Sequence, residues 1–365
     1  MTNREKQILR LIKSNPSISQ KEIAEILQIS RSSVAVHITR LMEKGYILGR
    51  CYLIAKDQYA TVIGGTTLDI VGRSTESLRD HDSNIGSINV SSGGVARNIA
   101  ENMGRLNMTV RFISAFGNDI AGDTIKKSLS DFDIDYSYSY NSPDLPSAKY
   151  MAILDDDGDM LMAVSDLSII ENITPEFIES NLEIIRSSEI TVLDTNLRLD
   201  TLEYILKSIP GKYFIDTVSL KKSEKLKNLL SYIHTLKPNR YEAEILSGIK
   251  VYDFDSAIKA GKRLNELGVK RAIITLGEKG AVLTEGDEIL KATAKPIEAV
   301  NATGAGDALM GALAYSYMEG YCNSEALKIA LAAARITIED RNTISNKINE
   351  ENLSIRKGEI KICKN

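Results

Sequence analysis

Residues 301–320 read NATGAGDALMGALAYSYMEG, a turn of small residues followed directly by an apolar helical stretch. Glycine and alanine let the chain turn tightly, and the backbone N–H groups at a helix start can then face an anion. Donors placed in this way stabilise charge on a phosphoryl group during transfer. Asp307 stands at the helix start, where a carboxylate could take a proton from an attacking hydroxyl group. A glycine-rich turn capped by an aspartate would look the same, so the stretch alone leaves both interpretations open.

From about residue 59 onward, short apolar runs alternate with helical stretches. The strand-like runs end in polar residues or glycine, and they read TVIGG, VRFISAFG, EITVLDTN, KYFIDTVS, IHTLKPN and RAIITLGEKG. Helical patterns such as ARNIAENMGRLN and DSAIKAGKRLNELGV lie between them. This alternation predicts an α/β domain with a mainly parallel sheet, in which ligands bind at the carboxyl ends of the strands.

Two segments, 70–91 and 147–165, have instead the pattern of short alternating strands. The acidic sequence DDDGD at 155–159 lies between two of these strands, and Asp157-Gly158 is a strong hairpin signal. Four aspartates could suggest a metal site, but the spacing of an EF-hand is absent. We therefore interpret DDDGD as a turn.

A second glycine-rich stretch, SSGGVARNIA at 91–100, joins a strand to a helix, and Gly117-Asn118-Asp119 and Gly122-Asp123 follow it. It resembles the first signature of the ribokinase-like (PfkB) carbohydrate kinases, and residues 301–313 resemble the second. The resemblance extends from about 60 to 350. It implies a three-layer α/β/α domain with a small β lid at about 70–91 and 147–165. P-loop and protein-kinase motifs are absent, so phosphoryl transfer would use this other apparatus.

Within this family, the stretches 165–174, 234–249 and 301–310 most resemble the pseudouridine-kinase branch. The implied reaction is transfer of the γ-phosphate of ATP to the 5′-hydroxyl of pseudouridine. Two alternatives stay open: a kinase of another sugar or nucleoside, and a ligand-sensing transcription regulator without turnover. The intact Asp307 argues against the second, because a pure sensor could dispense with a base.

The resemblance also implies roles for single residues. Asp307 would be the catalytic base, with Gly304, Ala305 and Gly306 as the anion hole. Asp69, in GGTTLDIVG at the end of the first strand, would accept hydrogen bonds from substrate hydroxyls. The complete set of acceptor-binding candidates is Asp69, Gly93, Gly94, Asn98, Lys149 and Asp166. Caps, turns and solvated surface are the structural alternatives for these positions.

On the nucleotide side, Asn239 and Glu242 form an Asn-x-x-Glu pattern that also fits a helix capping box. The resemblance makes Asn239 a triphosphate contact and Glu242 an organiser of Mg²⁺ through waters. It adds Thr275 and Gly277 as a nucleotide-binding strand end, and Gly304 and Gly306 as further nucleotide contacts. Many family members have aspartate where this chain has Asn301, and that aspartate helps to hold a monovalent cation. The neutral Asn301 leaves K⁺ activation open.

The charge of the chain is unevenly distributed. The composition is that of an ordinary globular protein of about two domains, which excludes disordered, collagen-like and disulfide-scaffold classes. Residues 1–57 hold 10 Lys and Arg against 5 Asp and Glu, whereas the rest hold 35 against 44. A basic head before an acidic body indicates that the head meets a polyanion.

The head has a helical pattern at 3–14, a Ser19-x-x-Glu22 capping box before a second helix, and Ser30 as the cap of a third. YILGRCYLI, which follows Gly45, reads as a hairpin. This order resembles a winged helix-turn-helix DNA-binding domain over residues 1–55, so we place the domain boundary between residues 57 and 58. The alternative is a helical packing or dimerisation module. The candidate contacts to double-stranded DNA are Arg31, Ser32, Ser33, His37, Arg40 and, in the wing, Arg50.

Three widely spaced cysteines without a CxxC pattern suit a reducing cytosol. Neither a signal peptide nor an apolar run of about 20 residues is visible, so we expect a cytoplasmic protein without a membrane segment. We also expect a homodimer, because helix-turn-helix proteins usually pair half-sites and the lid strands of this kinase family often pair.

Overall fold

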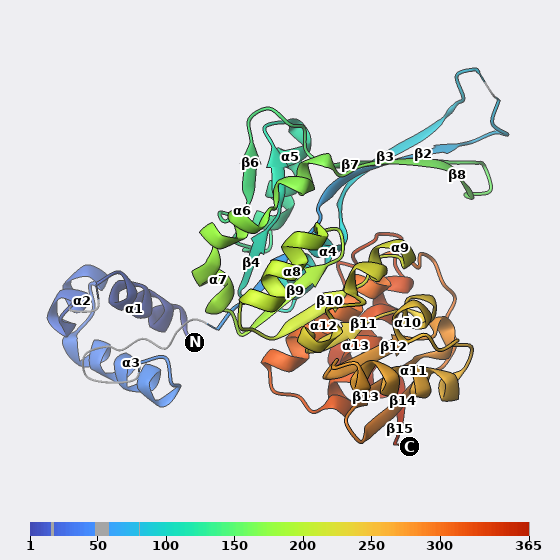
Figure 1. Ribbon diagram of the computed structural model, residues 1–365. Coiled ribbons are helices and arrows are strands. Elements are labelled where there is room, and N and C mark those ends of the chain that lie inside the picture. Colours follow the sequence, from blue (N-terminus) through green and yellow to red (C-terminus); the bar gives the residue numbers. More distant parts are fainter. Residues whose placement is uncertain (16–17, 48–57, 80, 365) are drawn as a thin grey trace. The chain divides into compact units, whose positions relative to one another are not determined.

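The computed structural model describes residues 1–15, 18–47, 58–79 and 81–364, and the chain divides into two compact units, Met1–Gln58 and Tyr59–Asn365 (Figure 1). The described part of the head contains α1 (Asn3–Ser14), α2 (Gln20–Leu27) and α3 (Arg31–Glu43). Capping side chains start each helix, because Thr2, Ser19 and Ser30 each accept a backbone N–H from the first turn. The apolar faces of the helices form one small core. The predicted hairpin lies mostly outside the described residues.

The larger unit is built on a nine-stranded sheet in the order β15-β14-β13-β12-β11-β10-β9-β1-β4. The strands from β4 to β12 run parallel, and β13 to β15 add an antiparallel edge. Their bounds are β1 (Ala60–Ile63), β4 (Val110–Ile113), β9 (Ile190–Asp194), β10 (Tyr213–Asp216), β11 (Thr235–Lys237), β12 (Arg271–Thr275), β13 (Ala281–Glu285), β14 (Glu288–Ala294) and β15 (Ile360–Lys364). All six strand-like runs of the sequence are therefore strands of this sheet.

Helices cover both faces of the sheet, because alternate residues of each strand point to opposite sides. Val62 and Phe214 belong to one buried cluster, whereas Ile63 and Ile215 belong to the other. The first cluster includes residues of α4 (Val95–Arg105), α5 (Ile120–Ser130), α12 (Ala305–Met318), α13 (Asn323–Ile338) and α14 (Glu350–Arg356). The second includes residues of α6 (Pro175–Ser180), α7 (Leu182–Arg186), α8 (Leu199–Ser208), α10 (Arg240–Ser247) and α11 (Phe254–Glu266). The predicted three-layer α/β/α architecture is confirmed.

A separate four-stranded sheet extends away from the main sheet (Figure 1). Its order is β3-β2-β7-β8, with bounds β2 (Thr67–Ser74), β3 (Gly86–Gly93), β7 (Lys149–Leu154) and β8 (Met160–Asp166). DDDGD connects β7 to β8, and β5 (Ala115–Gly117) pairs with β6 (Tyr140–Ser142) in a small ladder. One expectation was wrong: Asp69 lies inside lid strand β2, whereas the first strand ends at Ile63, because the chain crosses Gly64 and Gly65 before it re-enters extended structure.

Across the ranges that the structure describes, no helix combines the length and apolar character needed to cross a membrane.

Candidate functional site

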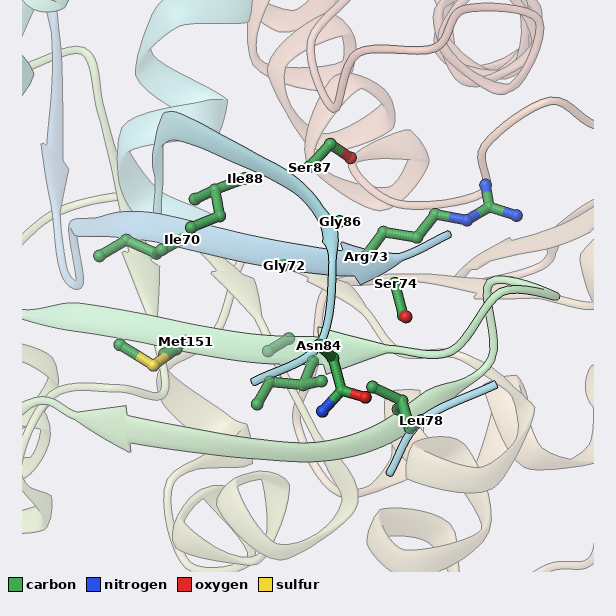
Figure 2. A pocket seen from close by; sticks show the side chains of 12 residues that line it. Ile70, Gly72, Arg73, Ser74, Leu78, Asn84, Gly86, Ser87, Ile88 and Met151 are labelled. Atoms are coloured by element: carbon green, nitrogen blue, oxygen red, sulfur yellow. The ribbon is translucent and has the colours of Figure 1, made fainter. Parts of the chain in front are cut away.

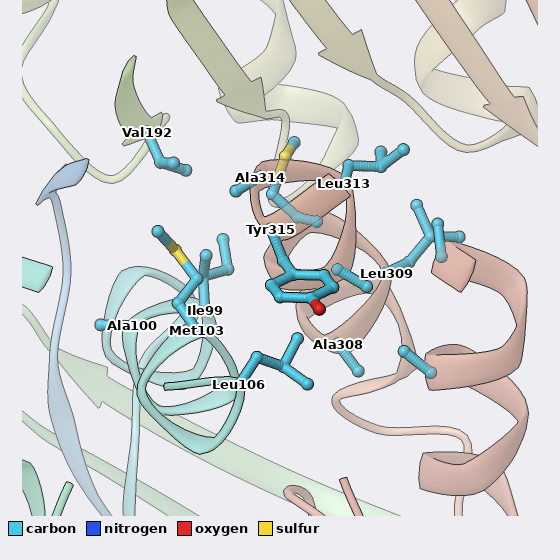
Figure 3. Close-up of a cluster of buried hydrophobic side chains, with 14 of the residues drawn as sticks. Ile99, Ala100, Met103, Leu106, Val192, Ala308, Leu309, Leu313, Ala314 and Tyr315 are labelled. Carbon is cyan, nitrogen blue, oxygen red and sulfur yellow. The ribbon is translucent and has the colours of Figure 1, made fainter. Parts of the chain in front are cut away.

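Helices α4 and α12 carry the two glycine-rich motifs, and they pack directly against each other. Figure 3 shows Ile99 and Met103 of α4 beside residues of α12 such as Ala308 and Leu309, in one buried cluster. Gly311 permits the close approach, because a Cβ there would lie 2.9 Å from the Cβ of Asn102. This packing sets the distance between the two motifs.

Asn98 and Asp307 meet where the two helices begin. The Asn98 amide Nδ2 donates a hydrogen bond of 2.9 Å to Oδ2 of Asp307, and both residues are buried. Burial and the nearby Asp216 raise the pKa of Asp307 to about 7, while the Asn98 hydrogen bond and the Lys237 ammonium act in the opposite direction. A carboxyl group with a pKa near neutrality is well suited to accept and return a proton.

The turn before α12 is shaped for an anion. Gly304 has a φ of 82°, and a Cβ on it would overlap the carbonyl oxygen of Thr343, so only glycine fits there. No side chain caps the start of α12, so its first N–H groups are left available to bind an anion. The Nζ atom of Lys237 lies 2.9 Å from the position that a Cβ on Gly306 would take, which adds a positive charge beside the helix start.

Asp69, a predicted substrate-binding residue, lies directly against the glycine pair Gly93 and Gly94. A Cβ on Gly93 would overlap the Asp69 carboxylate, and Gly94 has a φ of 93°. Thr67 Oγ1 donates to Oδ1 of Asp69 at 2.6 Å. Burial raises the pKa of Asp69, and the Thr67 hydrogen bond and Arg97 charge counteract it. Asp69, Gly93 and Gly94, which are predicted to bind the phosphoryl acceptor, thus lie at the base of the lid and the start of α4.

Asp194, which we did not select from the sequence, holds this region together. It is fully buried at the end of β9, and its Oδ2 accepts the backbone N–H groups of Gly65 and Ala96 at 3.0 Å each. Asn196 adds a backbone and a side-chain hydrogen bond. The carboxylate therefore ties the loop before β2 to the start of α4. Its only sequence signal was a polar residue after an apolar strand.

Asn239, Thr275 and Gly277 line a common pocket of about 440 Å³. Asn239 also caps α10, because its Oδ1 accepts the N–H groups of Tyr241 and Glu242. Glu242 is buried, and its Oε2 accepts the Asn239 N–H at 2.8 Å and the Thr217 hydroxyl at 2.5 Å. The structural alternative of a capping box is therefore present, and the pocket lies at the capped end.

Comparison with known proteins identifies the family. A model described as pfkB family carbohydrate kinase matches residues 57–350. The chain belongs to the PfkB family of carbohydrate kinases. A second model, described as winged helix-turn-helix DNA-binding, matches residues 1–47 of this PfkB-family kinase. The kinase is therefore a phosphotransferase with an alcohol acceptor, preceded by a winged helix-turn-helix domain.

Individual relatives agree with this assignment. The Escherichia coli K12 protein named uncharacterized sugar kinase YeiI is 35% identical over 341 residues, which cover 92% of this kinase and 94% of YeiI. The alignment is longer than the Tyr59–Asn365 unit, so it extends into the head. Pseudouridine kinase of the same strain is 32% identical over 283 residues, or 77% and 90% of the two chains. A solved putative sugar kinase from Clostridium perfringens has a TM-score of 0.78 and 33% identity, covering 85% and 99%.

Lys149 and Asp166 of the kinase, which are predicted to contact the phosphoryl acceptor, bind other residues of the chain in this structure. The Nζ atom of Lys149 lies 3.2 Å from Oδ2 of Asp119, the residue that caps α5 and binds Ser147. Hydrogen bonds from Ser147, Gly122 and Lys149 outweigh burial and hold the pKa of Asp119 at about 2. Asp166 is exposed and accepts the Ser168 N–H. Lys149 and Asp166 face each other across β7 and β8, so both mark the base of the lid.

Asn301 of the kinase stabilises its own loop. Its Oδ1 accepts the Thr303 N–H at 2.9 Å, and its Nδ2 donates to the Arg341 carbonyl at 3.1 Å. The amide thereby bridges the turn before α12 and the segment after α13.

The DNA candidates of the kinase lie along α3. Arg31, Ser32 and Arg40 are exposed, whereas Ser33 and His37 are half-buried. The Ser33 N–H is bound by the capping hydroxyl of Ser30 at 3.1 Å. Arg50 lies outside the described residues.

Proposed function

We propose that this PfkB-family kinase transfers the γ-phosphate of ATP to the 5′-hydroxyl of pseudouridine. The observation that carries phosphoryl transfer is Asp307, buried and bound by Asn98 beside the uncapped start of α12. The E. coli relative named pseudouridine kinase supports the choice of acceptor. Asp69 fits a ribose, because a carboxylate can accept hydrogen bonds from two neighbouring hydroxyl groups.

In the proposed reaction, Asp69, Gly93, Gly94 and Asn98 hold the sugar with its 5′-hydroxyl facing Asp307. The Asp307 carboxylate takes the hydroxyl proton as the oxygen attacks the γ-phosphorus. The new O–P bond forms while the bond to the β-phosphate oxygen breaks, and ADP leaves. The N–H groups of the 304–306 turn stabilise the charge on the moving phosphoryl group. Asp307 then releases its proton to solvent.

We place the nucleotide in the pocket lined by Asn239, Thr275 and Gly277, so that its phosphates point toward Gly304 and Gly306. Mg²⁺ would neutralise phosphate charge, and Glu242 would hold it through waters. The donor chemistry fits, because Mg²⁺ in phosphate sites takes one or two carboxylates and keeps several waters. Glu242 supplies a buried carboxylate next to the Thr217 hydroxyl.

We also propose that the head binds double-stranded DNA through the start of α3 and couples the kinase to transcriptional regulation. The exposed Arg31, Ser32 and Arg40 support this, together with the excess of basic over acidic residues in 1–57. We place the protein in the cytoplasm, where ATP and DNA are both available. The exposed free thiols of Cys322 and Cys363 stay reduced in that compartment.

A homodimer paired through the lid completes the proposal. The strand register places Val90, Ile70, Met151 and Val164 in one row, and the next row continues the same face. Several of these apolar side chains are exposed, including Ile88 at 74% and Val164 at 68%. Ile70, Ile88 and Met151 line a pocket of about 400 Å³, and Figure 2 shows these side chains. Contiguous exposed apolar surface marks an interaction site, and a helix-turn-helix head favours a second copy as the partner.

The kinase proposal is tested by measuring ADP release from Mg·ATP with pseudouridine, uridine, inosine, ribose and deoxyribose. We expect the highest kcat/KM with pseudouridine and loss of turnover in Asp307→Asn with ATP binding retained. Faster turnover of another compound would identify a kinase of that compound. Absence of turnover across the panel, with ligand-dependent DNA binding, would instead support the sensor.

A further inference from the structure

Arg97 is a buried cation directly beside the proposed catalytic pair. It lies in the first turn of α4, and its side chain is only 6% exposed. Its Nη1 atom donates to the Ser92 carbonyl at 3.0 Å and to Oδ1 of Asn98 at 3.2 Å. Its Nη2 atom pairs with Glu101 one helical turn later. Four side chains therefore form a continuous chain from Glu101 through Arg97 and Asn98 to Asp307.

The contact with Arg97 decides which end of the Asn98 amide faces Asp307. An asparagine side chain has a donor end and an acceptor end of nearly equal shape, and only the NH₂ end can bind a carboxylate. Because the Arg97 guanidinium occupies the oxygen end, the NH₂ group is left to donate to Asp307. Without Arg97, rotation of the amide would present its oxygen to Asp307, which is repulsive once that carboxyl is ionised.

Neutralisation of Glu101 does not explain why Arg97 is there. Arg105 already binds Glu101 through two nitrogens, at 2.9 and 2.8 Å. Among the described residues, Arg105 makes no hydrogen bond to Asn98 or Asp307, and its guanidinium lies over the Phe132 ring instead. A second buried guanidinium is costly unless its hydrogen bonds are used. The Nε–H of Arg97 has no partner among the described residues, and apart from the bond to Glu101 its remaining hydrogen bonds are made by Nη1 to Ser92 and Asn98.

We propose that Arg97 is a positioning residue for phosphoryl transfer, which holds the Asn98 amide with its NH₂ group toward Asp307. The inference rests on the proposed role of Asp307 as the base. Charged groups act on Asp307 from four elements: Arg97 from α4, Asp194 from β9, Asp216 from β10 and Lys237 from β11. Loss of Arg97 removes a positive charge and the oriented donor, and both changes disfavour the ionised form of Asp307.

The test is the pH profile of kcat in Arg97→Met, measured with whichever acceptor the wild type turns over fastest. We expect the acidic limb of the profile to move up by about one pH unit. The kcat of the variant should then be approximately tenfold lower than that of the wild type at pH values below the limb, and much less reduced at high pH. Arg105→Met is the matched control, because it also removes an arginine from Glu101, and its limb should stay in place. A uniform loss at every pH in Arg97→Met would overturn the proposal.

Two further variants separate orientation from charge and from misfolding. Arg97→Lys keeps the charge but lacks the planar fork that reaches two acceptors, so its limb should also move up. A wild-type profile for Arg97→Lys would overturn the claim that the amide is being oriented. Asn98→Ala should give a similar shift, and the Arg97→Met/Asn98→Ala double variant should shift no further than the larger single change. Additive shifts would contradict the chain of contacts.

Failure of the proposed function has a different outcome. If Asp307→Asn retains its turnover, then Asp307 is not the base, and the proposed function fails. If Asp307→Asn is inactive while the limb of Arg97→Met is unmoved, only the inference about Arg97 fails.

Discussion

The Nζ atom of Lys237 lies 2.8 Å from Oδ2 of Asp216, and this buried ion pair stands beside Gly306 and Asp307. The pair brings the ends of two adjacent parallel strands, β10 and β11, to the start of α12. Asp216 thus raises the pKa of the Asp307 carboxyl group, and Lys237 lowers it. Burial lowers, and Asp216 raises, the pKa of Lys237, with the net direction upward.

Replacing Asp216 should therefore make Asp307 a stronger acid. In Asp216→Asn, the negative charge that raises the pKa of Asp307 is gone, and Lys237 is free to stabilise the ionised carboxylate. We expect the acidic limb of kcat to move down by roughly one pH unit, or about 1.4 kcal/mol. The surface variant Asp123→Asn serves as the control. An upward movement of the limb would contradict the assignment of Asp307 as the titrating base.

Widening the contact between α4 and α12 should weaken both stability and catalysis. Gly311→Ala would place a Cβ 2.9 Å from that of Asn102, forcing the helices apart and lengthening the hydrogen bond from Asn98 to Asp307. We expect a loss of about 1–3 kcal/mol in the free energy of unfolding and a lower kcat. Gly358→Ala, where a Cβ meets nothing within 4 Å, is the matched control for denaturant melts and kinetics. If Gly311→Ala is less stable but its kcat is unchanged, the prediction that the packing of α4 on α12 controls catalysis is wrong.

The lid base should lose stability in acid through Asp119. Its pKa lies at about 2 in the folded chain, below the ordinary value of 3.8, so its hydrogen bonds stabilise the fold above pH 3.8. That contribution is lost as the pH falls from 3.8 through about 2. Asp119→Asn should therefore show a weaker decline of the free energy of unfolding over this range than the wild type. Parallel curves for the two proteins would refute the prediction.

A charge on the apolar lid face should separate the proposed dimer. Met162→Asp and Val164→Asp alter the exposed rows, whereas Ser165→Asp adds the same charge on the opposite face of β8. Light scattering on size-exclusion fractions should give half the wild-type mass for the first two variants and the wild-type mass for Ser165→Asp. A wild-type mass equal to one chain would remove the lid dimer from the proposal.

DNA binding by the head should depend on the exposed arginines of α3. Arg31→Ala and Arg40→Ala should weaken the mobility shift of a duplex from the upstream region of the gene, while Lys6→Ala on α1 has a smaller effect. Binding should fall with increasing salt if phosphate contacts dominate. Equal loss in all three variants would indicate a nonspecific basic surface.

Local periodicity and turn chemistry predicted the strands of the main sheet and the short strands at 70–91 and 147–165. The interpretation of those short strands as a lid, and of the two glycine-rich motifs as site residues, came from the resemblance to the PfkB kinases. The prediction for Asp69 was wrong by one element: it lies in β2 and not at the end of β1. The two glycines between these strands break the extended structure, and the hydrophobic pattern does not reveal that break. Lys237, Asp216 and Asp194 were passed over as ordinary ends of buried strands. Their roles arise only when neighbouring strands and the starts of α4 and α12 meet in three dimensions.

The two backbone groups that Asp194 binds, at Gly65 and Ala96, stand at either end of the β2–β3 excursion. One carboxylate therefore joins the chain just before β2 to the chain just after β3. The connection from β2 to β3 lies beyond the last paired residues of the two strands, Ser74 and Gly86. The entropic cost of closing a flexible connection grows only slowly, by about 0.6 kcal/mol for each doubling of its length, so residues can be added there at little cost. The protein can therefore lengthen this connection while the distance from Asn98 to Asp307 stays fixed.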